Sequence, residues 1–290
     1  MQDNLFGEKA IQLSVLRLDE LHPVVSGNKL FKLQLFLKQA VEENKTGVLT
    51  FGGPYSNHLV AAAFAAREND LKSVGFVRGE QPAILSHTLE ACDSYGMKLQ
   101  FITRDDYAKK FEPGFLNDIF QSFPNHLVIP EGGYDPLGSQ GAARIMDEIP
   151  AETTHICCAV GTATTVAGLL LGAKPNQKIV AFSALRGLSD FGDRIQYLTG
   201  LEYKDLNLEL VNEYDFGGYA KKNQQLFDFM NQFYLQYQIP TDMIYTGKMM
   251  FGVMQRIREN FFPPGSKIVC VHTGGLQGNQ SLPAGTLVFD

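Results

Sequence analysis

The chain has 290 residues, enough for about two domains at roughly 150 residues each. Its net charge of −6 gives no basic footprint for a phosphate backbone, so we expect no nucleic-acid partner. A hydrophobic content of 44% excludes general disorder.

The cysteines Cys92, Cys157, Cys158 and Cys270 lack the spacing of a disulfide framework or a metal site, so we expect no metal. Cys157 and Cys158 lie in one apolar run, where one should face each side of a sheet. Reduced thiols and an N-terminus without a visible signal peptide predict a cytoplasmic protein. The uncharged segment 156–173 is broken by polar and glycine residues, which indicates a strand, a loop and a helix instead of a membrane span.

Short apolar runs alternate with segments of helical periodicity along the whole chain. In chain order we expect a helix at 30–42, a strand at 48–51, a helix at 60–66, a strand at 73–77, a helix at 83–95, strands at 98–103 and 127–129, a helix at 138–148, strands at 156–160 and 179–183, helices at 220–237 and 251–261, and a strand at 267–271. Uncharged strands separated by helices predict an α/β protein whose parallel sheets are covered on both faces.

The first of these helices begins beside an unusual lysine. Asn28 can cap the helix and Gly27 allows the backbone to turn into it, which places Lys29 in the first turn. A cation is disfavoured there because the helix dipole is positive at this end. Lys29 is therefore either a solvent-exposed lysine without a function, which is the commoner case for a single lysine, or a functional amine.

Glycine-rich loops follow four of the predicted strands, at 52–58, 131–138, 161–168 and 272–279. Ligands of open α/β sheets bind beyond the carboxyl ends of strands, where free N–H groups meet helix starts. Loop 161–168 combines glycine with three threonine hydroxyls, which suits a phosphate dianion. The loops contain neither a P-loop nor a Gly-x-Gly-x-x-Gly motif. They predict a crevice for a phosphate-bearing ligand.

Segment 27–33, Gly-Asn-Lys-Leu-Phe-Lys-Leu, resembles the lysine motif of the 1-aminocyclopropane-1-carboxylate deaminase and D-cysteine desulfhydrase family. Further segments resemble family motifs in the family's order: 16–21, 53–58, 130–138, 160–165, 245–248 and 272–275. They cover nearly the whole chain. Phe31 stands where the family has a basic residue and Ala163-Thr164 where it has a Gly-Gly pair, and neither change removes a residue with a chemical role.

The resemblance implies pyridoxal 5'-phosphate (PLP) as the cofactor and the tryptophan-synthase β-type fold, called fold type II. That fold has two unequal open parallel-sheet domains with helices on both faces and PLP in the cleft between them. We expect a small domain at 33–143 and a large, phosphate-binding domain made of 1–32 and 144–290.

The resemblance also implies roles for single residues. Lys29 is similar to the Schiff-base lysine, which also exchanges protons with the substrate. Ser56 is similar to the residue that holds the substrate carboxylate, and Asn57 to the one that hydrogen-bonds the phenolic oxygen of the cofactor. Tyr245 resembles the ring that stacks on the pyridine and is a candidate for assisting proton transfer.

Two further sets of residues are implied to bind the cofactor. The phosphate loop is formed by Gly161, Thr162, Ala163, Thr164 and Thr165. A hydroxyl near the pyridine nitrogen comes from Thr273, or else from Thr246.

The implied activity is that of a PLP-dependent lyase or deaminase on a small amino acid, with a homodimer as the expected assembly. β-Elimination of D-cysteine to pyruvate, ammonia and sulfide is favoured, because Thr246 stands where the cyclopropane deaminases have a glutamate. The alternative is ring opening of 1-aminocyclopropane-1-carboxylate to 2-oxobutyrate and ammonia. Outside this class, the chain could be a non-catalytic binder of PLP or of an amino acid, or a sugar-phosphate enzyme without PLP.

Overall fold

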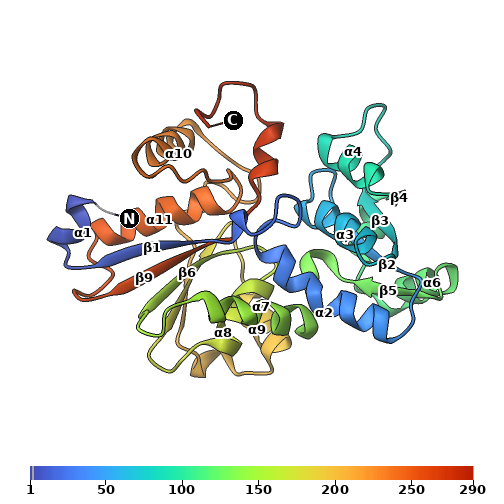
Figure 1. Cartoon of the computed structure of the whole chain (residues 1–290), viewed down its shortest axis with the longest axis horizontal. Helices are drawn as coiled ribbons and strands as arrows, with labels where there is room; N and C mark the ends of the chain where they lie inside the picture. The colour runs from blue at the N-terminus through green and yellow to red at the C-terminus, as the bar shows by residue number, and fades with distance from the viewer. Residues whose placement is uncertain (2, 290) are drawn as a thin grey trace.

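Two separate parallel sheets form the framework of the computed structural model, which describes residue 1 and residues 3–289. The larger sheet has the strand order β1-β9-β6-β7-β8 and the smaller has the order β4-β3-β2-β5, with all pairs parallel. The strands are β1 (Gln12–Arg17), β2 (Gly47–Gly52), β3 (Lys72–Arg78), β4 (Met97–Ile102), β5 (His126–Ile129), β6 (His155–Val160), β7 (Lys178–Ser183), β8 (Leu208–Val211) and β9 (Lys267–His272). Figure 1 shows the larger sheet on the left and the smaller on the right.

Helices cover both faces of the smaller sheet. They are α2 (Asn28–Glu42), α3 (Asn57–Arg67) and α4 (His87–Ser94) on one face, and α5 (Arg104–Ala108) and α6 (Pro113–Ser122) on the other. Successive residues of a strand face opposite sides, so Val48 packs under α2 and α3 whereas Leu49 packs under α5 and α6. Both faces are apolar, and this explains the uncharged strands of the sequence.

The larger sheet is covered in the same way. Its helices are α7 (Pro136–Ala143), α8 (Thr164–Gly172) and α9 (Phe191–Thr199) on one face, and α1 (Asn4–Glu8), α10 (Gln224–Tyr237) and α11 (Thr246–Arg258) on the other. Cys158 packs with α8 and α9, and Cys157 packs with α11, as the sequence predicts. The predicted fold class, two parallel α/β sheets with helices on both faces, is confirmed.

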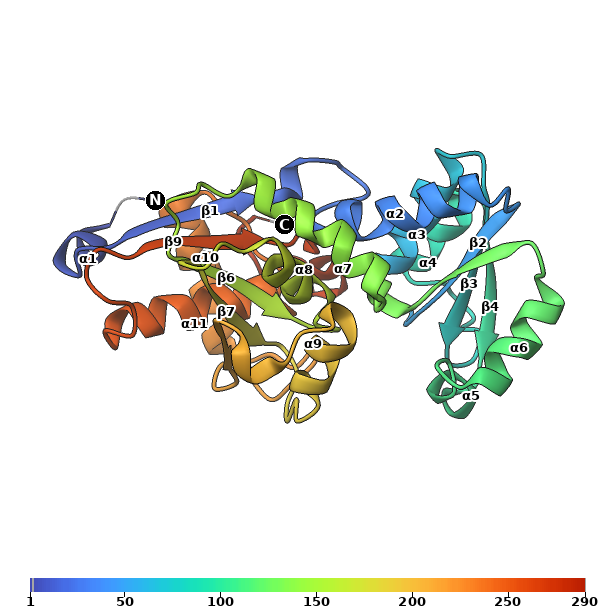
Figure 2. The same ribbon diagram turned by 90° about the horizontal axis from the view of Figure 1, so that it is seen from below.

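The two halves meet along α2 and α7, which lie between the sheets in the view from below (Figure 2). The helices approach closely at Gly141, where an added Cβ would lie 2.3 Å from the carbonyl oxygen of Phe31. The strands of the smaller sheet all lie within 33–143, and the others lie within 1–32 and 144–290. The predicted boundaries at 33 and 143 fall within or at the end of α2 and α7, which contact each other across the junction. The exact boundaries therefore stay a prediction.

All the predicted strands are present, and the structure adds two strands that were not predicted, β1 and β8. Both are edge strands of the larger sheet, and most of their residues are only partly buried. An edge strand has one hydrogen-bonded neighbour and a half-solvated surface, so its sequence lacks a continuous apolar run.

The helices differ more from the prediction. The helices α1, α5, α6 and α9 were not predicted, and the predicted helix at 251–261 begins earlier, at Thr246. The predicted helix at 220–237 begins at Gln224, where Asn223 caps it by accepting a hydrogen bond from the amide of Leu226. None of the described helices is both long and apolar enough to cross a membrane.

Candidate functional site

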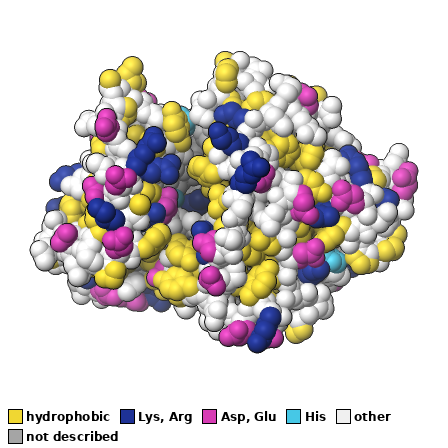
Figure 3. Space-filling model, turned by 180° about the vertical axis from the view of Figure 1, so that it is seen from behind, with side chains coloured by type: hydrophobic (Ala, Val, Ile, Leu, Met, Phe, Trp, Pro, Cys, Tyr) yellow, Lys and Arg dark blue, Asp and Glu magenta, His cyan; other side chains and the backbone are white. Residues whose placement is uncertain are grey.

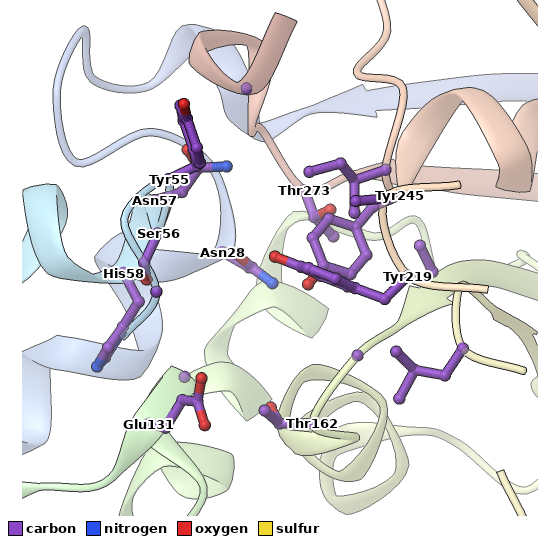
Figure 4. Close-up of a pocket in the computed structure, with 18 of the residues that line it drawn as sticks. Asn28, Tyr55, Ser56, Asn57, His58, Glu131, Thr162, Tyr219, Tyr245 and Thr273 are labelled. Atoms are coloured by element: carbon purple, nitrogen blue, oxygen red, sulfur yellow. The ribbon is translucent and has the colours of Figure 1, made fainter. Parts of the chain in front are cut away.

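A cavity of about 620 Å³ lies between the two domains and opens on the face shown in Figure 3. Four loops that leave the carboxyl ends of strands contribute to its walls: 53–56 after β2, 131–132 after β5, 161–163 after β6, and the segment after β9 that includes Thr273. These are the glycine-rich loops that the sequence predicted to form one crevice. Figure 4 shows that their labelled side chains come from both domains and surround the same space.

Lys29 enters this cavity from the first turn of α2. Gly27, not Asn28, is the N-cap, so the expected capping role of Asn28 is wrong. Gly27 has a φ of +69°, and an added Cβ would lie 1.9 Å from the carbonyl oxygen of Thr273. The Asn28 amide instead donates to Thr165 Oγ1 at 2.7 Å, and its oxygen accepts from Lys29 Nζ at 2.8 Å. Asn28 therefore connects the lysine to the threonine-rich loop.

A second lysine in the cavity, Lys32, was not singled out by the sequence analysis. It lies one helical turn after Lys29 and donates to the carbonyl oxygen of Gly132 at 3.2 Å. Burial lowers the pKa of Lys29 to about 8. Burial and the charge of Lys29 lower the pKa of Lys32 to about 7. Since neither ammonium group forms a salt bridge with a described residue, an anion entering the cavity would stabilise both.

The threonine-rich loop opens α8 without a capping side chain. Ala163 is the N-cap in a left-handed conformation, with φ +71°. The first N–H groups of a helix are unsatisfied and carry partial positive charge, so this nine-residue helix starts with free donors. Gly161, Thr162, Ala163 and Thr165 line the cavity, whereas the buried Thr164 is not among the lining residues and its hydroxyl contacts that of Thr162 at 2.9 Å.

Ser56 and Asn57 line the opposite wall, at the start of α3. The Ser56 hydroxyl accepts from the amide of Leu59 at 3.4 Å, and the Asn57 amide donates to the carbonyl oxygen of Gly275 at 3.5 Å. The side-chain oxygen of Asn57 is buried and has no partner among the described residues. Asn57 therefore keeps hydrogen-bonding capacity for a ligand.

Tyr245 closes one side of the cavity. Its ring packs on Gly161, where an added Cβ would lie 3.1 Å from the ring, and the ring of Tyr219 meets it edge-on at 6.2 Å between centroids. Burial raises the pKa of Tyr245 well above its usual value, so the phenol keeps its proton. Tyr219 was not predicted as a site residue. The segment that leads to it is fixed by Lys248, whose ammonium group donates to the carbonyl oxygens of Asp215 and Gly218 at 2.7 Å each.

The two threonine candidates for the pyridine nitrogen differ in their surroundings. Thr273 lines the cavity. Thr246 is fully buried, is not among the lining residues, and donates its hydroxyl to Asp242 Oδ2 at 2.6 Å. The Asp242 carboxylate also accepts from the amides of Ile244, Tyr245 and Thr246, at 2.8–2.9 Å. The Asp242 carboxylate thus accepts from the first N–H group of α11, although the N-cap of this helix is Tyr245.

A buried ionic cluster supports the loop that carries Thr273. Arg17 forms two hydrogen bonds with Asp19, at 2.9 and 2.7 Å, and His272 Nδ1 lies 3.0 Å from the same carboxylate. His272 Nε2 is 2.8 Å from the carbonyl oxygen of Pro240. Burial alone would raise the pKa of Asp19, but the hydrogen bonds of His272 and Arg17 outweigh it and lower the pKa to about 2.

Known proteins resemble the chain over most of its length. The family model for pyridoxal-phosphate dependent enzymes matches residues 4–274. A bifunctional D-cysteine desulfhydrase/1-aminocyclopropane-1-carboxylate deaminase of Arabidopsis thaliana is 28% identical over 88% of this chain and 70% of its own length. A 1-aminocyclopropane-1-carboxylate deaminase of Bradyrhizobium is 23% identical over 87% of this chain and 82% of its own length. The crystal structure of an ACC deaminase homologue superposes with a TM-score of 0.80 and 25% identity, over 95% of this chain and 88% of that one.

The residues around the cavity fit the cofactor of that family. A phosphate group matches the free donors at the start of α8, the Thr165 hydroxyl that Asn28 orients, and the Lys32 ammonium group. An aldehyde requires an amine, and Lys29 supplies one whose lowered pKa leaves part of it unprotonated near neutral pH. The planar ring matches the space beside Tyr245 and Thr273.

Proposed function

This chain belongs to the family of pyridoxal-phosphate dependent enzymes, and on that premise we propose that it catalyses β-elimination from a small β-substituted amino acid, with D-cysteine as the first substrate to test. Its cofactor is PLP. The observation that carries the proposal is the Lys29 amine, which lies in a cavity shared with a threonine-rich helix start and has a pKa of about 8. A group with a pKa near the working pH exchanges protons efficiently.

The chain's own residues divide the work of binding and proton transfer. When bound, PLP stabilises negative charge at the α-carbon of the substrate. We propose that Ser56 and the N–H groups at the start of α3 bind the substrate carboxylate, and that Asn57 orients the ring of the cofactor. Lys29 removes the α-proton of D-cysteine and the sulfur leaves as hydrosulfide. Hydrolysis of the resulting aminoacrylate gives pyruvate and ammonia.

The choice between the two named reactions depends on Thr246 and Thr273. A carboxylate beside a pyridine nitrogen keeps it protonated and makes the ring a stronger acceptor of electrons. Here Thr246 is bonded to Asp242, and Thr273 offers the cavity only a hydroxyl. A cyclopropane ring lacks both an α-hydrogen and a good leaving group, so its opening needs a strong acceptor. A thiolate departs easily, which favours D-cysteine.

Product formation from both substrates, under identical conditions with the PLP-loaded protein, tests the proposal. We expect sulfide and pyruvate from D-cysteine and little or no 2-oxobutyrate from 1-aminocyclopropane-1-carboxylate. Faster formation of 2-oxobutyrate than of pyruvate would reverse the choice. Inertness toward both compounds and toward other β-substituted amino acids would support a non-catalytic binder instead.

A further inference from the structure

The cavity is strongly cationic in a chain whose net charge is −6. Its ionisable lining residues, tyrosine and histidine apart, are Lys29, Lys32, Arg78, Arg194, Lys222 and a single acid, Glu131. Lys29 and Lys32 have the proposed roles given above. The other three cations remain without a role in binding a small amino acid with an uncharged side chain.

Arg78 lies beside the loop that carries the proposed substrate site. It ends β3, and one nitrogen of its guanidinium group is 3.5 Å from where a Cβ of Gly53 would be, in the loop that leads to Ser56. Arg78 forms no ion pair or side-chain hydrogen bond with another described residue. It also lines an adjoining hollow of about 560 Å³, together with Arg104 and Lys110. An exposed guanidinium group with its donors free is suited to a carboxylate, sulfonate or phosphate group.

The remaining charges of the cavity are divided between paired and unpaired groups. Arg194 contacts Asp190 at 2.9 Å, and Glu131 contacts Lys110 at 3.5 Å, so each of these charges is partly balanced. Lys222 comes from the large domain, on the other side of the cleft from Arg78, and has no ion pair with a described residue. Figure 3 shows Lys and Arg side chains on both sides of the groove. Two unpaired cations thus face the cleft from opposite domains.

We propose that this cleft selects amino acids that carry a second anionic group on the side chain, and that Arg78 is the residue that recognises this group. The proposal deepens the proposed function, because it assumes that the amino acid binds at Ser56. The phosphate of the cofactor and the α-carboxylate of the substrate match Lys32 and the two helix starts. Arg78 and Lys222 have no anionic partner among the described residues, and an anionic side chain of the substrate would supply one. D-cysteine remains compatible, since its sulfur departs with negative charge, but a permanent anion binds more tightly.

The test compares aspartate with asparagine, which have the same shape and differ in the charge of the side chain. Dissociation constants of both enantiomers are measured on the PLP-loaded protein by calorimetry and by the change in visible absorbance. For at least one enantiomer, aspartate should bind roughly tenfold more tightly than asparagine at low salt. This preference should decrease as salt is raised, because the site is open to solvent.

Variants test whether the preference for aspartate over asparagine depends on Arg78. Arg78→Gln should reduce the aspartate/asparagine ratio to within about twofold of unity, whereas Arg78→Lys should retain part of it. Lys221→Gln is the matched control, since Lys221 neighbours Lys222 in the chain but is not among the lining residues, and this variant should keep the full ratio. Equal binding of aspartate and asparagine, undetectable binding of aspartate, or an unchanged ratio in Arg78→Gln would overturn the inference.

The outcome is separable from that of the proposed function. An aspartate preference that depends on Arg78, in a protein that turns over no β-substituted amino acid, supports the recognition of a second anion and contradicts the proposed elimination. Formation of pyruvate from D-cysteine together with equal binding of aspartate and asparagine overturns this inference alone.

Discussion

Asp19→Asn should lower the free energy of unfolding by about 2–4 kcal/mol at pH 7, because it removes the buried carboxylate shared by Arg17 and His272. The pKa of Asp19 falls from 3.8 to about 2 in the folded protein, and about 1.4 kcal/mol per unit gives at least about 2 kcal/mol for its ionised form. The Asp19 side chain is only 2% exposed, so solvent screens this interaction little. Asparagine keeps the shape of the side chain but removes the negative charge beside Arg17 and His272, and Arg17 keeps only Glu20, at 2.9 Å, as a carboxylate partner.

The pH dependence follows from the sign of the shift. Since the folded pKa is depressed, the stabilisation by Asp19 is fully present above the unfolded pKa of about 4. It is lost as the pH falls through the folded pKa of about 2. The stability difference between the parent and Asp19→Asn should therefore shrink by about 1 kcal/mol between pH 5 and pH 3.

Denaturant unfolding of the PLP-free proteins, followed by circular dichroism, measures both effects without the added stability from ligand binding. Asp118→Asn is the control, because it removes a carboxylate that is exposed on α6. A variant within about 0.5 kcal/mol of the parent at pH 7, or a difference that stays constant from pH 5 to pH 3, would refute the role assigned to the cluster.

Three further substitutions test the site. Lys29→Ala should abolish turnover and the covalent attachment of PLP by borohydride, measured by mass spectrometry, with the circular dichroism spectrum unchanged; turnover at the parent rate would contradict its role. Thr165→Val removes a hydroxyl that Asn28 orients, and a charge-assisted hydrogen bond of about 1.5–3 kcal/mol predicts a ten- to hundredfold weaker affinity for PLP in a titration. Lys248→Met removes the donor to the carbonyl groups before Tyr219, so kcat should fall while the melting temperature of the apoprotein changes little. An unaltered kcat would show that the position of Tyr219 does not depend on Lys248.

The sequence predicted those parts of the fold whose residues are buried on every side. Uncharged runs such as 48–51 and 179–183 are too short for a typical buried helix and so indicate internal strands, and the structure confirms them as β2 and β7. The edge strands β1 and β8 could not be found in this way, because a half-solvated strand tolerates charges such as Glu209. At the start of α11 the Asp242 carboxylate accepts from the amide of Thr246, four residues further on, and this contact gives no signal in the apolar periodicity.

For the site, glycine loops at strand ends were sufficient to predict which segments meet. Lys32 and Tyr219 were missed for different reasons. Lys32 resembles any polar residue of a helix until α2 is placed against the loop at Gly132. Tyr219 lies in an irregular segment, where no periodicity marks it. Arg78 could have been found, since a charged residue that ends a buried strand lies at the ligand-binding edge of an α/β sheet.

The bond between Thr246 and Asp242 restricts how this sequence can evolve. A glutamate at position 246, the residue that the resemblance implies for the cyclopropane deaminases, would lose the hydroxyl that donates to Asp242 and bring a second carboxylate beside it. Two buried carboxylates repel, so the single exchange should be deleterious even where the new activity is favoured. The replacement of Thr246 by glutamate should be tolerated if Asp242 is replaced first, so the order of the two mutations matters. A double-mutant cycle of Thr246→Glu and Asp242→Asn, scored by stability, should show that the second change rescues the first; additive effects would remove this constraint.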